Sequence, residues 1–157
     1  KWLSDPTVLE YYEGRSNSFD LDKVKGKFVQ RARGESRVNV GVVEYKENPI
    51  GFVQYYEIAP NEYSETELID MREFKMPYGM DIIIGETDYW NKGIGTEILQ
   101  TLIKHLFEHL NVDIIFIDPQ TWNKRAIRCY EKCGFKAVDI INSTFPPPKG
   151  ACTLINQ

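Results

Sequence analysis

The chain has 157 residues, 42% of them hydrophobic and 13% aromatic, which predicts a folded domain with a substantial core and excludes a disordered chain. The net charge of −4 argues against a nucleic-acid partner, which would need a basic face, and suits a small cationic substrate. Since no membrane-length apolar run, signal-peptide pattern or metal-like spacing of the three cysteines is present, we expect a cytoplasmic protein, monomeric or homodimeric, without a membrane partner.

Helix-start and turn signals divide the first half of the chain into two helices and a hairpin. Ser4-Asp5-Pro6 combines a capping side chain with a proline at the first turn, and Gly14 provides a stop. The segments on both sides of Glu47-Asn48-Pro49 predict two strands joined by that turn. The predicted bounds are Thr7–Glu13 and Leu21–Ala32 for the helices, and Val38–Lys46 and Ile50–Ala59 for the strands.

The second half alternates strands with helices before two closing strands. The run Ile82-Ile83-Ile84 suggests a strand buried on both faces, and Gly134 is a common helix stop. An amphipathic helix is predicted by one apolar stripe, with Leu99 and Ile103 beside it, that consists of Ile98, Leu102, Leu106 and Leu110. The predicted strands are Tyr78–Gly85, Asp113–Asp118, Lys136–Ser143 and Ala151–Asn156, and the predicted helices are Glu97–Leu110 and Asn123–Cys133.

This order of elements predicts a mixed α/β or α+β fold with one largely antiparallel sheet. The central strand–helix–strand unit should cross over right-handed and make one parallel pair. Since no repeat or linker is present, residues 1–157 are expected to form a single domain. The sequence starts almost inside a helix signal, at Lys1-Trp2-Leu3, so we expect a leading strand to be missing.

The stretch Trp90-Asn91-Lys92-Gly93-Ile94-Gly95-Thr96 lies between a predicted strand and a predicted helix. A tight glycine loop at a helix start directs several backbone N–H groups to one point, where the helix dipole adds positive charge, and so predicts a phosphate site. Its spacing excludes a dinucleotide fingerprint, because Ile98 stands where a third glycine is needed. It also excludes a P-loop, because Lys92 precedes the glycine.

A second motif follows about thirty residues downstream. Asn123, Ala126 and Tyr130 lie on one predicted helix that ends at Gly134-Phe135. Together with Trp90-x-x-Gly93-x-Gly95, this closely resembles the GNAT superfamily of acetyl-coenzyme A-dependent N-acetyltransferases, whose loop is usually Gln/Arg-x-x-Gly-x-Gly/Ala. The resemblance implies the GNAT-like fold, a mostly antiparallel central sheet with flanking helices and a splayed parallel strand pair. Trp90 departs from the pattern, which leaves the loop amides available but removes one side-chain contact to the cofactor.

Further motifs narrow the resemblance to the aminoglycoside 6'-N-acetyltransferases. The matching segments are Val8-Leu9-Glu10-Tyr11-Tyr12-x-Gly14, Pro49-Ile50-Gly51-x-x-Gln54-x-Tyr56, Tyr78-Gly79-Met80-Asp81, Tyr89-Trp90-x-Lys92-Gly93-Ile94-Gly95-Thr96, Asp118-Pro119 and Arg125-Ala126-Ile127-Arg128-x-Tyr130. The activity implied is acetyl transfer from acetyl-CoA to an amine, most specifically the 6'-amine of an aminoglycoside.

The resemblance also implies which residues bind acetyl-CoA. The pyrophosphate would lie on the amides of Lys92 to Thr96, and the pantetheine arm would pair with the backbone of Ile82 to Ile84. Asn123 would bind the arm from the other side, although its position also fits a helix N-cap. The full predicted set is Ile82, Ile83, Ile84, Trp90, Lys92, Gly93, Ile94, Gly95, Thr96, Asn123, Ala126 and Tyr130.

Asp81 and Tyr130 are the predicted catalytic pair. Asp81 interrupts an apolar strand, where a charge is costly without a purpose or a partner, and would deprotonate the amine directly or through a water. The alternative is a hydrogen-bonded structural aspartate at a bulge. Tyr130 would protonate the leaving thiolate, and the alternative is an ordinary half-buried helix tyrosine. By resemblance, an N–H group near Ile82 would stabilise the oxyanion.

By resemblance, the acceptor would be bound by aromatic and carboxylate side chains, namely Tyr11, Tyr12, Gln54, Tyr56, Asp81 and Asp118. The acidic stretch from Glu57 to Glu73 is either a solvated loop or a flap that attracts a polycation. Two other enzyme or binding classes stay open: acetylation of another amine, such as a polyamine, a peptide N-terminus or a siderophore precursor, and a non-catalytic acyl-CoA-binding module.

Two pairs of side chains with helical spacing could carry other chemistry. Cys129 beside Tyr130 could form an acyl-cysteine, but no histidine lies nearby in sequence, and buried or half-buried thiols at Cys129 and Cys133 are the favoured interpretation. His105 and His109 are spaced like metal ligands, yet no H-E-x-x-H pattern or suitably placed cysteine completes a site. No metal is therefore expected.

Overall fold

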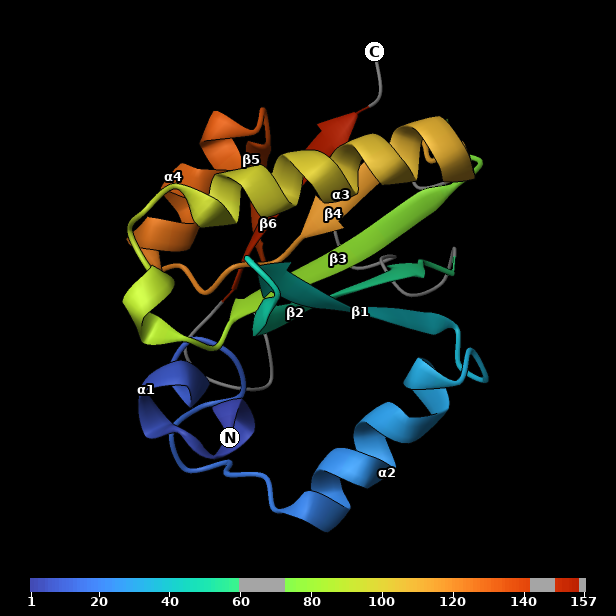
Figure 1. Ribbon diagram of the computed structural model, residues 1–157. Coiled ribbons are helices and arrows are strands. Elements are labelled where there is room, and N and C mark those ends of the chain that lie inside the picture. The colour runs from blue at the N-terminus through green and yellow to red at the C-terminus, as the bar shows by residue number, and fades with distance from the viewer. Residues whose placement is uncertain (60–72, 142–148, 156–157) are drawn as a thin grey trace. The chain divides into compact units, whose positions relative to one another are not determined.

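The computed structural model describes residues 1–59, 73–141 and 149–155, with side chains described up to residue 138. The chain divides into a first unit, residues 1–56 with 81–95, and a second unit, residues 57–80 with 96–157. Strand β3 (Pro77–Ile84) belongs to both units, and the six-stranded sheet has the order β1-β2-β3-β4-β6-β5 (Figure 1). That residues 1–157 form one domain stays a prediction.

Capping side chains set the helix starts of the first unit. Asp5 accepts a hydrogen bond from the Thr7 amide at 2.8 Å and begins α1 (Pro6–Leu9), which has a proline in its first turn. Asp20 accepts from the Lys23 amide at 2.8 Å and begins α2 (Leu21–Ala32), which has the predicted bounds. The prediction of a helix over residues 7–13 was too long. The amides of the two tyrosines after α1 bond to carbonyls only three residues back, so the chain tightens into turns there.

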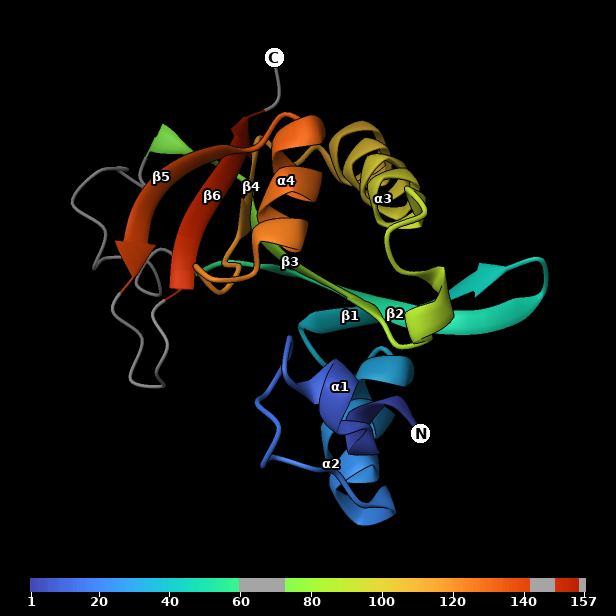
Figure 2. The ribbon, with the colours of Figure 1, turned by 90° about the vertical axis from the view of Figure 1, so that its left-hand side faces the viewer.

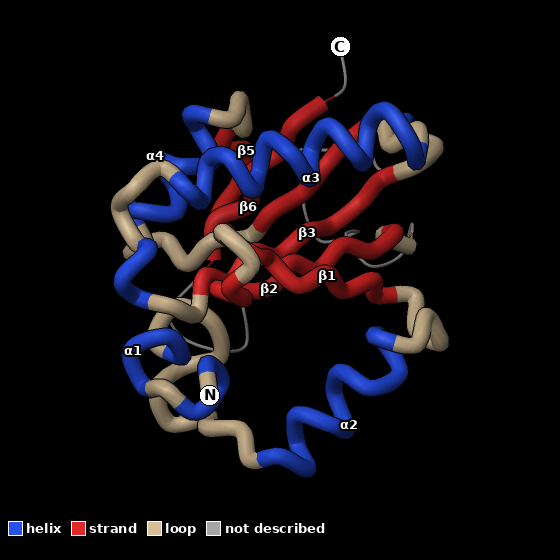
Figure 3. The backbone as a smooth tube through the Cα atoms, viewed as in Figure 1, coloured by secondary structure: helices blue, strands red, loops and turns tan. Residues whose placement is uncertain are grey.

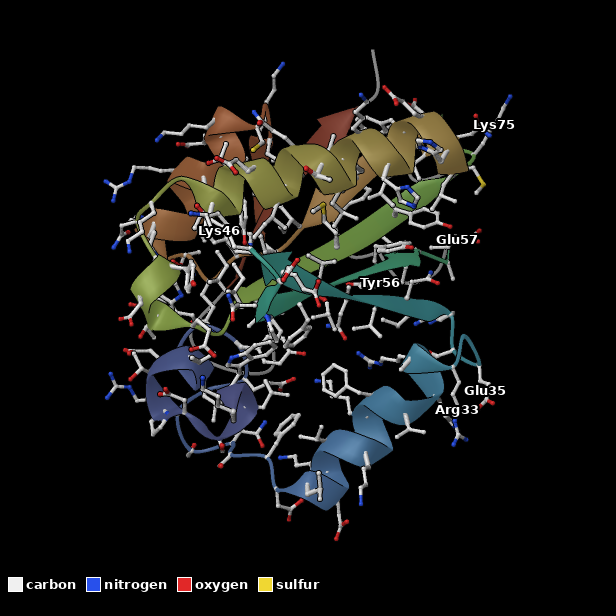
Figure 4. All side chains as sticks on the ribbon, in the orientation of Figure 1. Arg33, Glu35, Lys46, Tyr56, Glu57 and Lys75 are labelled. Atoms are coloured by element: carbon white, nitrogen blue, oxygen red, sulfur yellow. The ribbon has the colours of Figure 1, made fainter. Side chains whose placement is uncertain are left out.

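The hairpin pairs β1 (Val38–Tyr45) with β2 (Asn48–Glu57) in antiparallel register. The predicted turn at residues 47–49 was wrong. Lys46 and Glu47 form a two-residue turn with φ of 49° and 65°, a geometry that matches the twist of the flanking strands. Figure 4 labels Lys46 at this turn. Pro49 is accommodated inside β2 because its pairing lies beside a register shift in β1.

An aromatic core joins the helices of the first unit to the sheet. Phe52 lies at its centre, with ring centroids 5.3 Å from Phe28, 6.0 Å from Tyr12 and 6.4 Å from Trp2 of the 3-10 helix η1 (Trp2–Ser4). Figures 1 and 2 show α1 and α2 on the same face of the β1–β2 hairpin. Because none of its residues is buried, α2 is held mainly by half-buried side chains on one side.

Strand β2 also lies directly against the carboxyl half of β3 within the first unit. A Cβ on Gly51 would lie 2.0 Å from the carbonyl oxygen of Ile83, so only glycine allows this approach. The amide of Gly85, just after β3, donates to the carbonyl oxygen of Ile50 at 2.8 Å. The residues that follow Met80 are thereby fixed beside β2.

The second unit contains the parallel pair that the sequence predicted. The amino half of β3 pairs in parallel with β4 (Ile114–Ile117) over three residue pairs, and all four residues of β4 are buried. Strand β6 (Lys149–Ile155) pairs antiparallel with both β4 and β5 (Lys136–Ile141). The predicted fold class, a mixed and mostly antiparallel sheet with flanking helices, is therefore confirmed. The predicted strand ends at Ser143 and Asn156 lie outside the described residues.

Two helices of the second unit carry the predicted motifs, α3 (Ile94–Leu110) and α4 (Lys124–Lys132), which lie side by side in Figures 1 and 2. Helix α3 begins three residues before the predicted Glu97, inside the glycine loop. Its buried side chains are Ile94, Leu99, Leu102 and Leu106, which include two residues of the predicted stripe and Leu99 beside it, while the ends of the stripe are half-buried. Figure 3 shows the helices and strands in contrasting colours. Within the described residues, no helix has the length and apolarity that a membrane span requires.

Candidate active site

The loop after β3 is tied to the end of that strand by an aromatic side chain. Trp90 donates its indole N–H to the carbonyl oxygen of Ile84 at 2.8 Å, and its ring meets the ring of Tyr11 edge-on at 5.4 Å. Trp90, which departs from the GNAT pattern, thus makes a hydrogen bond within the protein with its indole N–H group. Tyr11, a predicted acceptor residue, packs on this loop.

The backbone conformation at position 93, and not a lack of room for a side chain, requires glycine there. Gly93 has a φ of +81°, and a Cβ there would meet no atom within 4 Å. Since α3 begins at Ile94, the next N–H groups belong to its first turn, where an α-helix has no internal acceptors for them. The predicted donors from Lys92 to Thr96 therefore comprise the loop end and the start of α3. That arrangement fits an anion such as a pyrophosphate.

Within the second unit, Thr96 of α3 contacts two cysteines on α4 and at its carboxyl end. Its hydroxyl lies 3.3 Å from the Cys129 sulfur, and the Cys133 sulfur lies 3.9 Å from its carbonyl oxygen. The first turn of α3 is thus fixed against the middle of α4. The structure brings together Thr96 and the α4 motif, which the sequence linked only by resemblance.

Asn123 is the N-cap of α4. Its side-chain oxygen accepts a hydrogen bond from the Ala126 amide at 3.2 Å, and the residue is only 9% exposed. The capping interpretation is confirmed, and a role toward a cofactor stays a prediction. Tyr130, two turns into the helix, is buried, and its ring lies 6.0 Å from that of Phe135.

The first unit gathers three of the predicted acceptor residues. Gln54 is only 2% exposed, and its side-chain nitrogen lies 3.3 Å from a carboxylate oxygen of Asp81 and 3.4 Å from the hydroxyl oxygen of Tyr12. Asp81 itself is half-buried on β3. Tyr56, which Figure 4 labels, lies two positions along β2 from Gln54, and the alternation of side chains along a strand puts both on the same face. The network places an ionisable carboxylate among aromatic side chains.

Lys27 and Glu13 make an ion pair beside this network, and the Lys27 ammonium lies 5.0 Å from the centre of the Tyr12 ring. Burial raises the pKa of Tyr12, an effect that Lys27 opposes and that the charge of Asp81 reinforces. Burial lowers the pKa of Lys27, but its bonds to Glu13 and Tyr12 outweigh burial, so its pKa is raised overall. Both groups therefore keep their protons at neutral pH.

Sequence reasoning missed the contribution of α2. Arg31 donates a hydrogen bond to the Gln54 side-chain oxygen, and its guanidinium lies 5.5 Å from the Phe28 ring. A signal was present, because Lys23, Lys27 and Arg31 are spaced by four and must share one helix face. Arg33 and Glu35 beyond it are exposed (Figure 4).

Comparison with known proteins identifies the family. The family model for the acetyltransferase (GNAT) domain matches residues 1–143. The chain belongs to this family. Among curated relatives, the aminoglycoside N(6')-acetyltransferase type 1 of Klebsiella pneumoniae is 27% identical over 139 residues, which are 87% of this chain and 66% of the relative. The kanamycin resistance protein of Rhizobium radiobacter is 41% identical over 58 residues, which are 37% of this chain and 54% of the relative.

The GNAT domain described here thus spans slightly less than two thirds of the length of the first curated relative. A crystal structure of the aminoglycoside acetyltransferase AAC(6')-Ib in complex with coenzyme A has a TM-score of 0.79 and 25% identity, covering 99% of this chain and 86% of that one. The spermidine N-acetyltransferase of Vibrio cholerae, solved with coenzyme A and spermine, has a TM-score of 0.76 at 18% identity and covers 98% of this chain and 85% of that one. It is similar in fold.

The remaining predicted residues of this GNAT domain are described in separate units. Asp118 follows β4 in the second unit and is half-buried, whereas Asp81 belongs to the first unit. Tyr130 also belongs to the second unit. That Asp118 and Tyr130 act together with Asp81 stays a prediction. Most of the acidic stretch, residues 60–72, lies outside the described residues, so its role as a flap also stays a prediction.

The alternative chemistries find no support in the part of the chain that the structure describes. Cys129 and Cys133 are half-buried free thiols, as predicted, and burial together with Cys129 raises the pKa of Cys133 to about 11. His105 and His109 are exposed and stack on each other with ring centroids 5.2 Å apart. Among the described residues, no three histidine, cysteine or acidic side chains are placed to share a metal ion.

Proposed function

We propose that this GNAT domain transfers an acetyl group from acetyl-CoA to the 6'-amine of an aminoglycoside. The observation that carries the proposal is the Asp81 carboxylate, held by Gln54 beside Tyr12 on a strand that is otherwise apolar. The curated relatives named above for aminoglycoside acetylation and kanamycin resistance support this choice of acceptor.

The residues present fit coenzyme A. Gly93 has no side chain to cover the amides at the start of α3, and a Cβ built at this position would meet no atom within 4 Å. Ile82 to Ile84 would offer backbone groups to the pantetheine arm, and Asn123 would add a side-chain contact from the start of α4. Bound acetyl-CoA would supply an acetyl group activated as a thioester, whose carbon–sulfur bond breaks as the carbon–nitrogen bond forms.

Asp81 and Tyr130 would move the two protons of this reaction. Asp81 accepts a proton from the acceptor ammonium, directly or through a water, which leaves a nitrogen lone pair able to attack. A backbone N–H near Ile82 stabilises the charge that develops on the carbonyl oxygen. Tyr130 donates its phenolic proton to the departing sulfur, a reasonable exchange because an ordinary phenol has a pKa of about 10. Two protons leave the nitrogen between the ammonium and the amide. Asp81 would take the first before attack and pass it to solvent, and the second would leave after attack and restore the phenol of Tyr130, so that one proton is released overall.

An amine that also carries an acidic group is the second candidate acceptor. Arg31 is half-buried beside the Gln54–Asp81 pair, and it forms no ion pair with any carboxylate whose position the structure describes. A guanidinium in that environment is suited to bind a carboxylate. An amino-acid-like acceptor would use this group to hold its carboxylate.

A thiol-release assay with acetyl-CoA separates these candidates. The panel contains a kanamycin-type aminoglycoside, a matched aminoglycoside with a hydroxyl in place of the 6'-amine, a linear polyamine and an amino acid with a side-chain amine. Turnover with the first compound alone, and one acetyl group on its 6'-nitrogen by mass spectrometry and NMR, is the expected result. Equal turnover with the 6'-hydroxyl compound contradicts the proposed position, and preference for the amino acid supports the second candidate.

The same assay tests whether the domain is an enzyme. If coenzyme A binds but no amine of the panel is acetylated, a non-catalytic acyl-CoA-binding module becomes the better account. If turnover is present, Tyr130→Phe should lower kcat more at high pH than at low pH, because the lost proton donor matters most when the solvent supplies few protons. An unchanged kcat at every pH would remove Tyr130 from the mechanism.

A further inference from the structure

Gln54, which the sequence suggested as an acceptor-binding residue, is buried. At 2% exposure it has almost no surface to offer an acceptor, although it is one of only two buried polar or charged side chains among the described residues. An amide in such a position must satisfy its donors and its acceptor inside the protein. Its partners therefore define its function.

The partners fix which way the amide points. Arg31 carries only donors, so the atom of Gln54 that faces it has to be the oxygen. The amide nitrogen is then directed to Asp81 at 3.3 Å and to the Tyr12 hydroxyl at 3.4 Å. Reversal of the amide would place an N–H group against a guanidinium and a carbonyl oxygen against a carboxylate, which is unfavourable at both ends.

An N–H donor on a carboxylate oxygen has two effects. It favours the ionised form of the carboxylate, and it restricts the rotation of that side chain. A general base needs both, because it has to be charged and correctly placed when the ammonium arrives. The contacts run in one direction, from Arg31 on α2 through Gln54 on β2 to Asp81 on β3.

We propose that Gln54 is a positioning residue for Asp81, and that Arg31 orients Gln54 for this purpose. The inference rests on the proposed role of Asp81 as a base, and it replaces acceptor binding as the role of Gln54. It also makes α2 part of the catalytic apparatus, although none of its residues is buried.

The charged and titratable groups around the network come from several elements. Tyr12 and Glu13 follow α1, and Lys27 and Arg31 lie on α2. The pKa of Tyr12 and that of Lys27 are both raised, so these two groups titrate only on the alkaline side. Neither Tyr12 nor Lys27 therefore contributes to the acidic limb of a pH profile.

Substitutions at Gln54 provide the first test. Gln54→Glu places a second carboxylate against Asp81, and Gln54→Leu removes the donor without adding a charge. In both variants the acidic limb of kcat/KM should move to higher pH, with a loss of about tenfold for each pH unit moved at pH values below its midpoint, and with recovery of rate at higher pH in Gln54→Glu. Gln30→Leu, at an exposed position of α2, is the matched control and should keep the wild-type profile.

Arg31 provides the second test. Arg31→Met should move the acidic limb in the same direction as Gln54→Leu, and Arg31→Lys, which keeps a donor-only cation, should recover part of the effect. The pH shifts caused by Arg31→Met and Gln54→Leu should not add in the double variant, since both substitutions act on one carboxylate. If the variants instead raise KM for the amine and leave the pH profile in place, Gln54 contacts the acceptor and the proposal is overturned.

A readout without turnover separates this inference from the proposed function. The carboxyl carbon of Asp81, in protein labelled with ¹³C at aspartate and assigned with Asp81→Asn, reports its protonation by NMR whether or not any amine is acetylated. A higher titration midpoint in Gln54→Leu than in the wild type supports the positioning role. An unchanged midpoint in a folded variant overturns it, and absence of turnover with every amine overturns only the proposed function.

Discussion

The two units differ in how their predicted functional residues are brought together. In the second unit the motif residues lie on two helices, at helix starts or on one helix face, and are joined by short contacts such as that between Thr96 and Cys129. In the first unit, hydrogen bonds join side chains that are 23, 27 and 42 residues apart in the chain. The contact between Thr96 and Cys129 also joins distant positions, 33 residues apart, so both ends depend on tertiary packing. What differs is that the predicted residues of the second unit lie on helices whose starts follow from local sequence, whereas those of the first unit are joined by hydrogen bonds between different elements.

The largest expected effect tests the chemistry assigned to the first unit. Asp81→Asn keeps the shape of the side chain but cannot accept a proton from an ammonium, so kcat should fall by about 10²- to 10⁴-fold. Asp88→Asn, at an exposed position in the 3-10 helix η3 (Thr87–Tyr89), should change kcat by less than about twofold. The kcat of both variants is measured with saturating acetyl-CoA. A loss under tenfold in Asp81→Asn would mean that another group or the solvent takes the proton.

For stability, we expect the larger effect in the second unit and the smaller one in the first. Leu106 is fully buried in α3, so Leu106→Ala should lower the free energy of unfolding by about 2–5 kcal/mol. Val29→Ala on α2, where the side chain is 38% exposed, should change it by no more than about 0.5 kcal/mol. Urea unfolding followed by circular dichroism measures both. Similar losses in the two variants would show that α2 is anchored as firmly as α3.

The same contrast explains what the sequence could predict. The bounds of α2, the parallel β3–β4 pair and the N-cap at Asn123 follow from capping residues, glycines and apolar runs that lie close together in the chain. The hairpin turn was misplaced because Lys46 and Glu47 adopt positive φ without the glycine that usually signals it. The residue types at these positions could not show that β1 and β2 would be joined by a two-residue turn there.

The acceptor end was predicted only in part, for a physical reason. Tyr12, Gln54 and Asp81 were named by resemblance, and the structure places them together. Which group donates to which was not predictable, because the orientation of the Gln54 amide is set by Arg31 on another element. The basic stripe of α2 was visible in the sequence, but only packing against β2 gives it a role.

Two glycines of the first unit allow a sharper test, since substitution by alanine should change the free energy of unfolding in opposite directions at the two positions. Gly93 has a φ of +81°, so Gly93→Ala should lower the free energy of unfolding by about 1–2 kcal/mol and weaken coenzyme A binding. Gly26 lies inside α2 with open space around it, so Gly26→Ala should raise the free energy of unfolding by about 1 kcal/mol. Urea unfolding and calorimetric titration with coenzyme A provide the two measurements. Equal signs would contradict the backbone argument for Gly93.

The smallest effect on activity is expected at the thiols that join α3 to α4. With a pKa of about 11 in place of 9.0, Cys133 stays protonated through the neutral range, because burial and the neighbouring Cys129 both disfavour a thiolate. Its alkylation by iodoacetamide, followed by peptide mass spectrometry, should therefore reach half of its maximal rate near pH 11. Cys133→Ala should leave kcat within about twofold of the wild type, since no step of the proposed reaction uses this sulfur. Half-maximal alkylation at or below pH 9 would contradict the buried site, and a large loss of kcat in a folded variant would show that the contact between α4 and Thr96 matters to the reaction.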